Sequence, residues 1–340
     1  MLLFEAKAVG IRLTSIHSLH YVVYGPSERP AESHVAEENG HRQRALAMTS
    51  TKKQFALALH GGAGPVAGRD YAVTEQHLAK LARECESGLK SGRSALDVVE
   101  HAVTELEVCG LYVAGRGSAP NSAGHVELDA SIMDGRSREA GAVAALRDFV
   151  SPVQVARGVM EKTPHVMLAG HGALEFGRAN GFAEVPDPTD YYTLPVGVTS
   201  DDIQDIAHGT VGAVALDTSG GLAAATSTGG TFGKLHGRIG DTPLIGPGTW
   251  ADDNIAISCT GTGEHIIRAG GAAAIAFRYR SGIALHDAIG EMLDEVKRLG
   301  GDAGVVAVTR NAEIAMPYNS DGMKRAAVST AAQLVVATFA

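Results

Sequence analysis

Apolar residues follow two different periods in the first folded part of the sequence. Residues 54–59 form a short, mostly apolar run that ends in HGGAG at 60–64. Such a run predicts a buried strand that breaks into a turn at the glycines. Residues 75–107 carry apolar side chains at steps of three and four, which predicts helices, and Ser94 is placed to cap the second of two.

Strands and helices continue to alternate along the rest of the chain. The sequence VELDASIMD at 126–134 predicts a strand. The order of strands and helices predicts an α/β sandwich in which helices cover stacked sheets. The later elements are helices over 152–180, broken at Pro164, and over 264–299, and short strands over 304–309 and 313–316.

Two segments lack any sustained period. We expect residues 1–47 to be a poorly structured extension, and Met48 is a candidate start of the chain. Residues 183–209 carry three prolines and six acidic side chains, so we expect a flexible linker there. Residues 48–340 are expected to form one structural domain.

The most strand-like passage follows that linker. Small and β-branched residues dominate two segments, TVGAVALD and LAAATSTGG, and the TSGG between them favours a tight hairpin. A turn centred between Ser219 and Gly220 pairs Thr210 with Gly229. It also brings Thr210 beside Thr228, so the sequence predicts two threonine hydroxyls at one end of a sheet.

A threonine hydroxyl acts as a nucleophile only if a base takes its proton. The sequence suggests no neighbouring His–Asp pair and contains no GxSxG. An N-terminal threonine carries its own base, because an α-amine has a pKa near ~8. Cleavage of the Gly209–Thr210 bond would create that amine. On the pattern alone, the commoner interpretation is that Thr210 is an ordinary strand residue at a loop exit.

Composition narrows the functional classes. The chain has 340 residues, is 45% hydrophobic and carries a net charge of −9, which argues against a nucleic-acid partner. No apolar run approaches the ~20 residues of a membrane span. Cys85, Cys109 and Cys259 are too few for a disulfide framework or a zinc site. The amino terminus lacks a secretory pattern, so we expect a cytoplasmic protein.

Several ordered motifs together resemble one family. They are HGGAG at 60–64, AGRGS at 114–118, VELDASIMDG at 126–135, HGTVGAVALDTSGGLAAATSTGGTFGKLHGRIGDTPLIGPG at 208–248, SCTGTGEHIIR at 258–268 and MPYNSDGM at 316–323. Over 54–325 the chain resembles the plant-type L-asparaginases/isoaspartyl peptidases, which are N-terminal nucleophile (Ntn) hydrolases. The resemblance implies an αββα four-layer sandwich, split by autoproteolysis into an α subunit of 48–209 and a β subunit of 210–340. It also implies a homodimer of αβ units.

The resemblance implies roles for matching residues. Thr210 matches the nucleophile freed by cleavage after Gly209, and Thr228 matches the threonine that orients it. Thr260 and Gly261 match the oxyanion hole, whose donors stabilise charge on the scissile carbonyl. The positions that match the substrate-binding set are Arg238, Asp241, Gly230 and Gly263. A surface salt bridge for the Arg–Asp pair and a plain glycine-rich turn at CTGTG remain alternatives on sequence.

The segment LEVCGLYVAGR at 106–116 matches the family's loop around a structural sodium ion. Its ligands match the main-chain carbonyls of Leu106, Glu107, Cys109, Tyr112, Ala114 and Arg116, and hard oxygen ligands suit a hard cation. Val113 stands where family members usually have asparagine, which puts the rate of self-cleavage and the substrate range in doubt. His60 and the glycines after it match a loop near the cleavage site, where a structural and a catalytic role are both open. The resemblance implies no catalytic cofactor.

The implied reaction is hydrolysis of isoaspartyl dipeptides and L-asparagine through an acyl-enzyme on Thr210. A glycosylasparaginase-like amidase is the alternative within the class, and the short sequence over 230–237 disfavours it. A catalytically silent homologue that acts as a binding protein is the alternative outside the class. It predicts one uncut band on a denaturing gel, whereas the enzyme predicts two fragments of unequal size.

Overall fold

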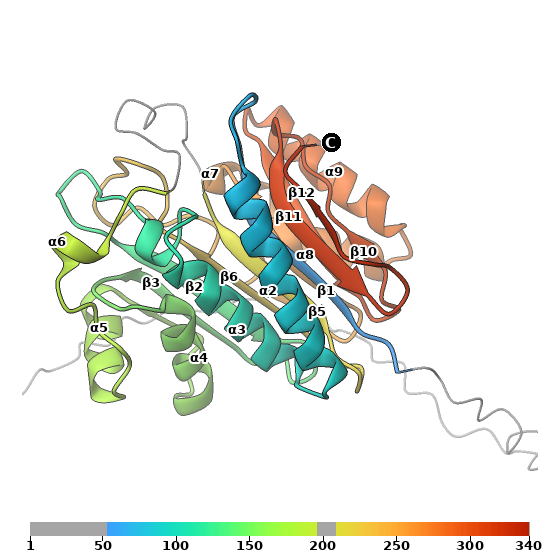
Figure 1. The fold of residues 1–340 in the computed structure, drawn as a ribbon, viewed down its shortest axis with the longest axis horizontal. Helices are drawn as coiled ribbons and strands as arrows, with labels where there is room; N and C mark the ends of the chain where they lie inside the picture. The colour runs from blue at the N-terminus through green and yellow to red at the C-terminus, as the bar shows by residue number, and fades with distance from the viewer. Residues whose placement is uncertain (1–52, 196–208, 340) are drawn as a thin grey trace, which may run out of the picture. The chain divides into compact units, whose positions relative to one another are not determined.

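The computed structural model describes residues 53–195 and 209–339 (Figure 1). The expected extension, residues 1–47, lies outside them. The helices are α2 (Ala72–Lys90), α3 (Ala95–Val108), α4 (Pro152–Lys162), α5 (Gly170–Ala179), α6 (Pro188–Tyr191), α7 (Gly263–Ala269), α8 (Gly271–Arg280) and α9 (Leu285–Arg298), with a short 3-10 turn at Gly115–Gly117. The strands are β1 (Ala56–Ala63), β2 (Leu128–Asp134), β3 (Ala140–Leu146), β4 (Met167–Ala169), β5 (Val211–Leu216), β6 (Leu222–Thr228), β7 (Thr249–Ala251), β8 (Ile255–Gly261), β9 (Ala303–Thr309), β10 (Ile314–Ala315), β11 (Met323–Ser329) and β12 (Val335–Ala337).

The strands form two sheets. The larger sheet has the order β12-β11-β1-β5-β6-β2-β3-β4, and the smaller has the order β10-β9-β8-β7. All neighbours are antiparallel except β3 and β4. Strand β5 lies between β1 and β6, so the residue just before it, Thr210, sits at the end of a central strand.

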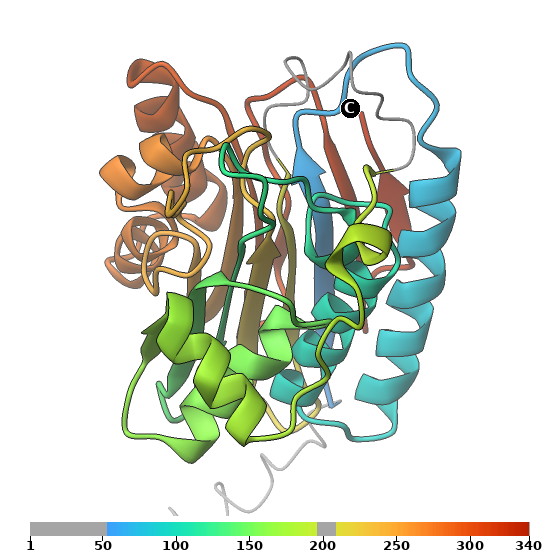
Figure 2. The same cartoon turned by 90° about the vertical axis from the view of Figure 1, so that its left-hand side faces the viewer.

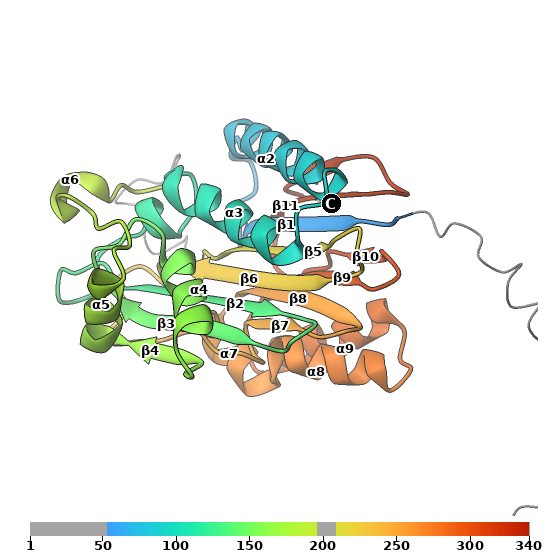
Figure 3. The same ribbon diagram turned by 90° about the horizontal axis from the view of Figure 1, so that it is seen from below.

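Alternate residues of β5 bury opposite faces of the larger sheet. Val211 and Ala213 belong to the core under α2, α3 and α4, whereas Val214 and Leu216 belong to the core shared with the smaller sheet. Helices α7, α8 and α9 cover the outer face of the smaller sheet, and Figures 2 and 3 show helices on both outer sides of the paired sheets. The predicted four-layer αββα sandwich is therefore confirmed.

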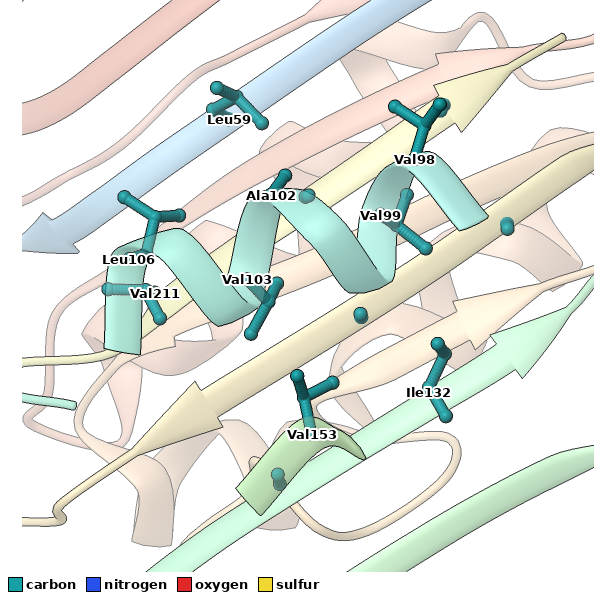
Figure 4. Packing of buried hydrophobic residues seen from close by; sticks show 14 of the residues in the cluster. Leu59, Val98, Val99, Ala102, Val103, Leu106, Ile132, Val153 and Val211 are labelled. Carbon is teal, nitrogen blue, oxygen red and sulfur yellow. The ribbon is translucent and has the colours of Figure 1, made fainter. Parts of the chain in front are cut away.

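Helix α3 fixes the outer layer over the centre of the larger sheet. The side chains of Val99, Val103 and Leu106 recur at helical spacing and are fully buried. Figure 4 shows α3 lying over the strands of the larger sheet, with Leu106 next to Val211 of β5. The predicted cap is confirmed at the start of this helix, where the hydroxyl of Ser94 accepts the N–H of residue 97 at 3.1 Å.

Three sequence predictions need correction. The first strand does not break at the glycines: β1 continues to Ala63 with a bulge after His60. Residues 264–299 are three helices instead of one stretch, because Gly270 is left-handed at φ 76° and ends α7. Part of the predicted linker is ordered, since residues 188–191 form α6 and the Thr193 N–H donates to the Arg116 carbonyl. The segment 196–208 lies outside the described residues.

Several strands escaped prediction. Strands β4, β7 and β12 have three residues each, too few to show a period. Strand β11 carries Lys324 and Arg325, which hide its pairing with β1. In the part of the chain that the structure describes, no helix is long and apolar enough to cross a membrane.

Candidate active site

The hydroxyl of Thr228 links Thr210 to the peptide bond before it. The Thr210 hydroxyl donates to Thr228 Oγ1 at 3.3 Å, and the Thr228 hydroxyl donates to the Gly209 carbonyl at 2.5 Å. The Gly230 N–H donates to Thr228 Oγ1 at 2.9 Å, which holds the oxygen in place. Both threonine side chains are buried. One hydroxyl thus contacts the candidate nucleophile and the candidate scissile carbonyl together.

The hairpin that brings the two threonines together differs from the prediction by one residue. The Gly220 N–H donates to the Asp217 carbonyl, the Asp217 N–H donates to the Gly221 carbonyl, and Gly220 has φ 85°. This is a three-residue loop with a left-handed glycine, and not a two-residue turn. Val211 therefore pairs with Ser227, which puts Thr210 opposite Thr228 instead of Gly229.

Close packing leaves no room for a side chain at Gly209. A Cβ at Gly209 would lie 2.2 Å from the Cβ of Val113, and the Val113 carbonyl accepts the Gly229 N–H at 3.0 Å. On the other side, a Cβ at Gly62 would lie 3.3 Å from the Thr210 carbonyl oxygen. The Gly209–Thr210 bond is held between these two segments. Val113 contributes an apolar contact there, in place of the polar neighbour that asparagine would offer.

Replacing Gly209 with alanine tests this packing. The added methyl collides with Val113, and overpacking costs about 1–3 kcal/mol, so self-cleavage should slow roughly five- to 150-fold. The rate is read on denaturing gels over time. Adding Val113→Gly removes the colliding atoms and should restore much of the rate. A Gly209→Ala chain that cleaves at the normal rate would show that this contact does not constrain the bond.

Arg238 and Asp241 lie together beside Gly263. A Cβ at Gly263 would lie 3.0 Å from Asp241 Oδ1 and 3.1 Å from Arg238 Nη2, so a side chain there would press against both groups. Two guanidinium nitrogens of Arg238, Nε and Nη2, donate to the Glu264 carboxylate at 2.7 Å each. The sequence left open a salt bridge between Arg238 and Asp241. Arg238 does form an ion pair, but with Glu264, and Asp241 lies next to that pair without joining it.

The carboxylate of Asp241 is buried and incompletely bonded. Its side chain is 3% exposed, and its Oδ2 has no hydrogen-bond partner among the described residues. Burial raises the pKa of Asp241 to about 7, although the nearby Arg238 opposes the shift. A buried acceptor without a donor favours a ligand that brings one, such as an ammonium group.

Thr260 and Gly261 end strand β8 near the bulged end of β1. The Thr260 hydroxyl oxygen accepts the Ala63 N–H at 3.1 Å, which leaves its own hydrogen to donate. Gly261 has φ 135°, and a Cβ there would lie 2.3 Å from the Asp302 carbonyl oxygen. These contacts require glycine at 261 and hold the hydroxyl at 260.

A small cavity joins the predicted residues. Its volume is about 10 Å³, room for about one water. All the predicted cleavage, catalytic and substrate residues line it except Thr260, which is fully buried behind them. The lining residues are Gly209, Thr210, Thr228, Gly230, Thr231, Arg238, Gly240, Asp241, Thr242, Gly261 and Gly263.

Comparison with known proteins identifies the family. The sequence model of the asparaginase family matches residues 53–194 and 190–337. The chain belongs to the asparaginase family. Membership makes it an amidohydrolase of the N-terminal nucleophile type, so the predicted family is confirmed.

Relatives from distant organisms cover most of this asparaginase-family chain. An isoaspartyl peptidase of Salmonella typhimurium is 42% identical over 295 residues, which covers 79% of this chain and 94% of that protein. An isoaspartyl peptidase of Escherichia coli is 40% identical and covers 79% and 91%. An isoaspartyl peptidase/L-asparaginase of Mus musculus is 41% identical and covers 79% and 86%.

The predicted sodium loop follows the end of α3. The last carbonyls of a helix lack intrahelical partners and carry partial negative charge, which suits a cation. A Cβ at Gly115 would lie 2.5 Å from the Glu107 carbonyl oxygen, and one at Gly117 would lie 2.0 Å from the Tyr112 carbonyl oxygen. Two predicted ligand carbonyls therefore press into the loop, and the residues fit a main-chain oxygen site.

Other carbonyls of that loop also accept protein hydrogen bonds. The Ala114 carbonyl accepts the Gly117 N–H, and the Arg116 carbonyl accepts the Thr193 N–H. Each carbonyl oxygen has a second lone pair, so these bonds leave room for an ion. Among the described residues, no group of three or more histidine, cysteine, aspartate or glutamate side chains is arranged to hold a metal.

Sequence reasoning missed two neighbours of the site, Glu264 and Lys234, and it placed His60 near the cleavage site without predicting its contact. Glu264 pairs with Arg238, and the only sign of this in the sequence is that an acidic residue directly follows Gly263. Lys234 is buried, and its ammonium donates to the Glu127 carbonyl behind Gly230. His60 contacts the Thr210 carbonyl through Nδ1 at 3.2 Å. Nothing in the sequence pairs these residues, since each contact crosses between segments far apart in the chain.

Proposed function

We propose that this asparaginase-family chain hydrolyses β-aspartyl dipeptides and L-asparagine with Thr210, after cutting its own chain before that residue. The printed names of the relatives support the substrates. The observation that carries the mechanism is the Thr228 hydroxyl, which bonds both the Thr210 hydroxyl and the Gly209 carbonyl. The test compares β-aspartyl-leucine, L-asparagine and a glycosylated asparagine as substrates of the cleaved protein. Preference for the glycosylated substrate would favour the glycosylasparaginase-like alternative.

Self-cleavage begins with the Thr210 oxygen attacking the Gly209 carbonyl carbon. Thr228 accepts the proton of the attacking hydroxyl and gives its own hydrogen to the carbonyl oxygen as negative charge develops there. Collapse breaks the carbon–nitrogen bond, and the nitrogen of Thr210 takes up a proton. The resulting ester is hydrolysed by water, which leaves the Gly209 carboxylate and a free amine on Thr210.

The free amine then serves as the base for substrate. It takes the hydroxyl proton while Thr210 Oγ1 attacks the side-chain carbonyl of the aspartyl group. The amine or ammonia of the substrate leaves with that proton, and water hydrolyses the aspartyl ester to release aspartate. Thr260 and Gly261 stabilise the oxyanion in both steps, and loss of one such donor costs roughly 3 kcal/mol of barrier.

Arg238 and Asp241 bind the common part of both substrates. The guanidinium of Arg238 pairs with the α-carboxylate, and Asp241 accepts hydrogens from the α-ammonium. Gly230 and Gly263 leave space for these groups, since a Cβ at either would lie 3.0 Å or less from Lys234 or Asp241. The dimer of αβ units and the cytoplasmic location remain predictions of the sequence.

The buried Asp241 gives a prediction for pH. With a pKa of about 7 in the free enzyme, its carboxyl becomes protonated as the pH falls below 7 and no longer attracts an ammonium. In the complex the bound ammonium keeps it ionised. We therefore expect kcat/KM to fall more steeply than kcat between about pH 7 and pH 6. Parallel profiles of the two constants would contradict the role of Asp241.

We also propose that the loop at 106–116 holds a structural sodium ion through the carbonyls of Leu106, Glu107, Cys109, Tyr112, Ala114 and Arg116. The ion neutralises the carbonyls at the end of α3 and steadies the segment that carries Val113; it takes no part in the reaction. No catalytic cofactor is proposed.

Replacing sodium by choline in the buffer tests this loop. The melting temperature should fall by about 2–4 °C for each kcal/mol of lost binding energy. Gly115→Ala puts a methyl against the Glu107 carbonyl oxygen and should abolish the sodium dependence. A melting temperature that is the same in both salts would argue against the ion.

A further inference from the structure

A chain of buried hydroxyls begins at His60 and runs between the two sheets. His60 Nε2 lies 2.8 Å from Ser258 Oγ, which lies 2.8 Å from Thr226 Oγ1. Thr226 Oγ1 lies 2.5 Å from Thr249 Oγ1, which lies 2.7 Å from Ser131 Oγ. All five side chains are fully buried, and they come alternately from the larger and the smaller sheet.

Each end of this chain meets a main-chain carbonyl of the candidate active site. At one end, His60 Nδ1 lies 3.2 Å from the Thr210 carbonyl oxygen. At the other, Ser131 Oγ lies 2.6 Å from the carbonyl oxygen of Thr242, the residue after Asp241. The chain therefore connects the nucleophile segment with the substrate-binding segment through the core.

A glycine leaves the space in which the chain begins. A Cβ at Gly212, on the central strand β5, would lie 2.1 Å from Ser258 Oγ and 2.3 Å from His60 Nε2. Any other residue there would separate the imidazole from the first hydroxyl. Buried polar groups must be hydrogen-bonded to avoid a cost in free energy, whereas apolar side chains would fill this interface without that requirement. The arrangement thus needs an explanation other than packing.

The hydroxyl chain has one polar hydrogen fewer than it has hydrogen-bonding contacts. Each of the four hydroxyls contributes one hydrogen, and a neutral imidazole contributes one, which makes five hydrogens for six contacts. Burial lowers the pKa of His60 to about 3, so the ring is neutral at physiological pH. One contact must therefore lack a hydrogen.

The contact that lacks a hydrogen is the one between His60 and the Thr210 carbonyl. Five contacts measure 2.5–2.8 Å, and two oxygens without a hydrogen between them would repel each other at that distance. The contact from His60 Nδ1 to the Thr210 carbonyl is the longest, at 3.2 Å. The hydrogens then all point away from His60, with its Nε2–H donating to Ser258 and the Ser131 hydroxyl donating to the Thr242 carbonyl. His60 is the Nε2–H tautomer in this orientation.

We propose that His60, Ser258, Thr226, Thr249 and Ser131 form a positioning relay that couples the main chain of Thr210 to that of Thr242. The relay rests on the proposed function of those two segments. A hydrogen bond to the Thr242 carbonyl is made at the expense of one to the Thr210 carbonyl. The side chains of the relay position the segments on either side of the substrate and do not touch the substrate.

Removing one distant hydroxyl should reverse the relay. In Ser131→Ala, four hydrogens remain for four contacts, so every contact is satisfied if all hydrogens point toward the Thr210 carbonyl. That orientation requires the Nδ1–H tautomer of His60, although three other hydroxyls separate Ser131 from the imidazole. Nitrogen-15 NMR of the imidazole reads the tautomer, with the His60 signals assigned by their loss in His60→Gln. The Thr210→Ala background keeps the chain uncut and retains the carbonyl at residue 210.

Matched variants separate the relay from general effects of mutation. Thr309→Val removes another fully buried hydroxyl of the smaller sheet, outside the relay, and should leave the tautomer as Nε2–H. Thr226→Ser keeps the relay hydroxyl and should also leave it unchanged. If Ser131→Ala leaves His60 as the Nε2–H tautomer, or if Thr309→Val switches it as well, the relay is refuted.

The same variants have an expected effect on turnover. In the active protein, Ser131→Ala deprives the Thr242 carbonyl of its donor and should raise KM roughly three- to tenfold, as expected for one hydrogen bond. Thr226→Ser and Thr309→Val should keep the normal KM. If the parent protein neither cleaves itself nor hydrolyses substrate, the proposed function fails. If the parent is active and Ser131→Ala behaves like Thr309→Val, only the relay fails.

Discussion

Replacing Thr210 with alanine should yield a folded, continuous chain that neither cleaves itself nor hydrolyses β-aspartyl dipeptides. The substitution removes the oxygen that attacks Gly209 and, in the cleaved enzyme, the oxygen that attacks the substrate. Loss of a catalytic nucleophile costs on the order of 10⁶-fold in other hydrolases, so residual activity should lie at the detection limit. Denaturing gels and a coupled assay of aspartate release measure the two losses.

Two controls keep that result interpretable. Thr210→Ser retains the hydroxyl and should still cleave, more slowly, because the methyl that restricts the side-chain rotamer is missing. Thr218→Ala removes a hydroxyl at the tip of the same hairpin, away from the site, and should behave as the parent chain. Cleavage before residue 210 in the alanine variant would exclude Thr210 as the attacking group.

Arg238→Ala should cut itself normally and yet lose substrate. The guanidinium contacts neither Gly209 nor Thr228 in the hydrogen bonds described, so self-cleavage does not depend on it. Without Arg238, the Glu264 carboxylate is left to repel the substrate carboxylate. Breaking such a charged contact costs about 3 kcal/mol, on the order of 100-fold in kcat/KM.

Glu264→Gln is the matched control for Arg238. It removes a negative charge that competes for the guanidinium and keeps the shape of the side chain. Substrate affinity should be retained or increase, and steady-state kinetics of both variants make the comparison. If Arg238→Ala fails to process as completely as it fails to turn over, the residue acts on the precursor and its substrate-binding role is wrong.

The hairpin shows how far local sequence carries the prediction. Small and β-branched residues flanking a glycine-containing turn predicted β5, β6 and the meeting of Thr210 with Thr228, all of which the structure contains. The register was wrong by one residue, because the loop has three residues and a left-handed Gly220 instead of two. Turn types are defined by backbone angles, and the same turn residues are compatible with more than one type, so composition alone does not determine the loop length.

Contacts between distant segments were beyond the sequence. The family resemblance supplied Arg238 and Asp241, but not the ion pair from Arg238 to Glu264. The hydroxyl chain was also invisible, since Ser131 and Ser258 are ordinary small residues in strands and meet only when two sheets stack. Strand β11 was missed because its charged residues flank the buried ones. Such features follow from tertiary packing, and the local pattern of apolar and polar residues does not predict it.

Intact-mass measurement combined with N-terminal sequencing of the incubated protein shows directly whether Thr210 becomes a new amino terminus. We expect two fragments, one ending at Gly209 and one beginning with Thr210, that appear in step with hydrolytic activity. Full turnover of β-aspartyl dipeptides by protein whose backbone is still continuous between Gly209 and Thr210 would contradict it.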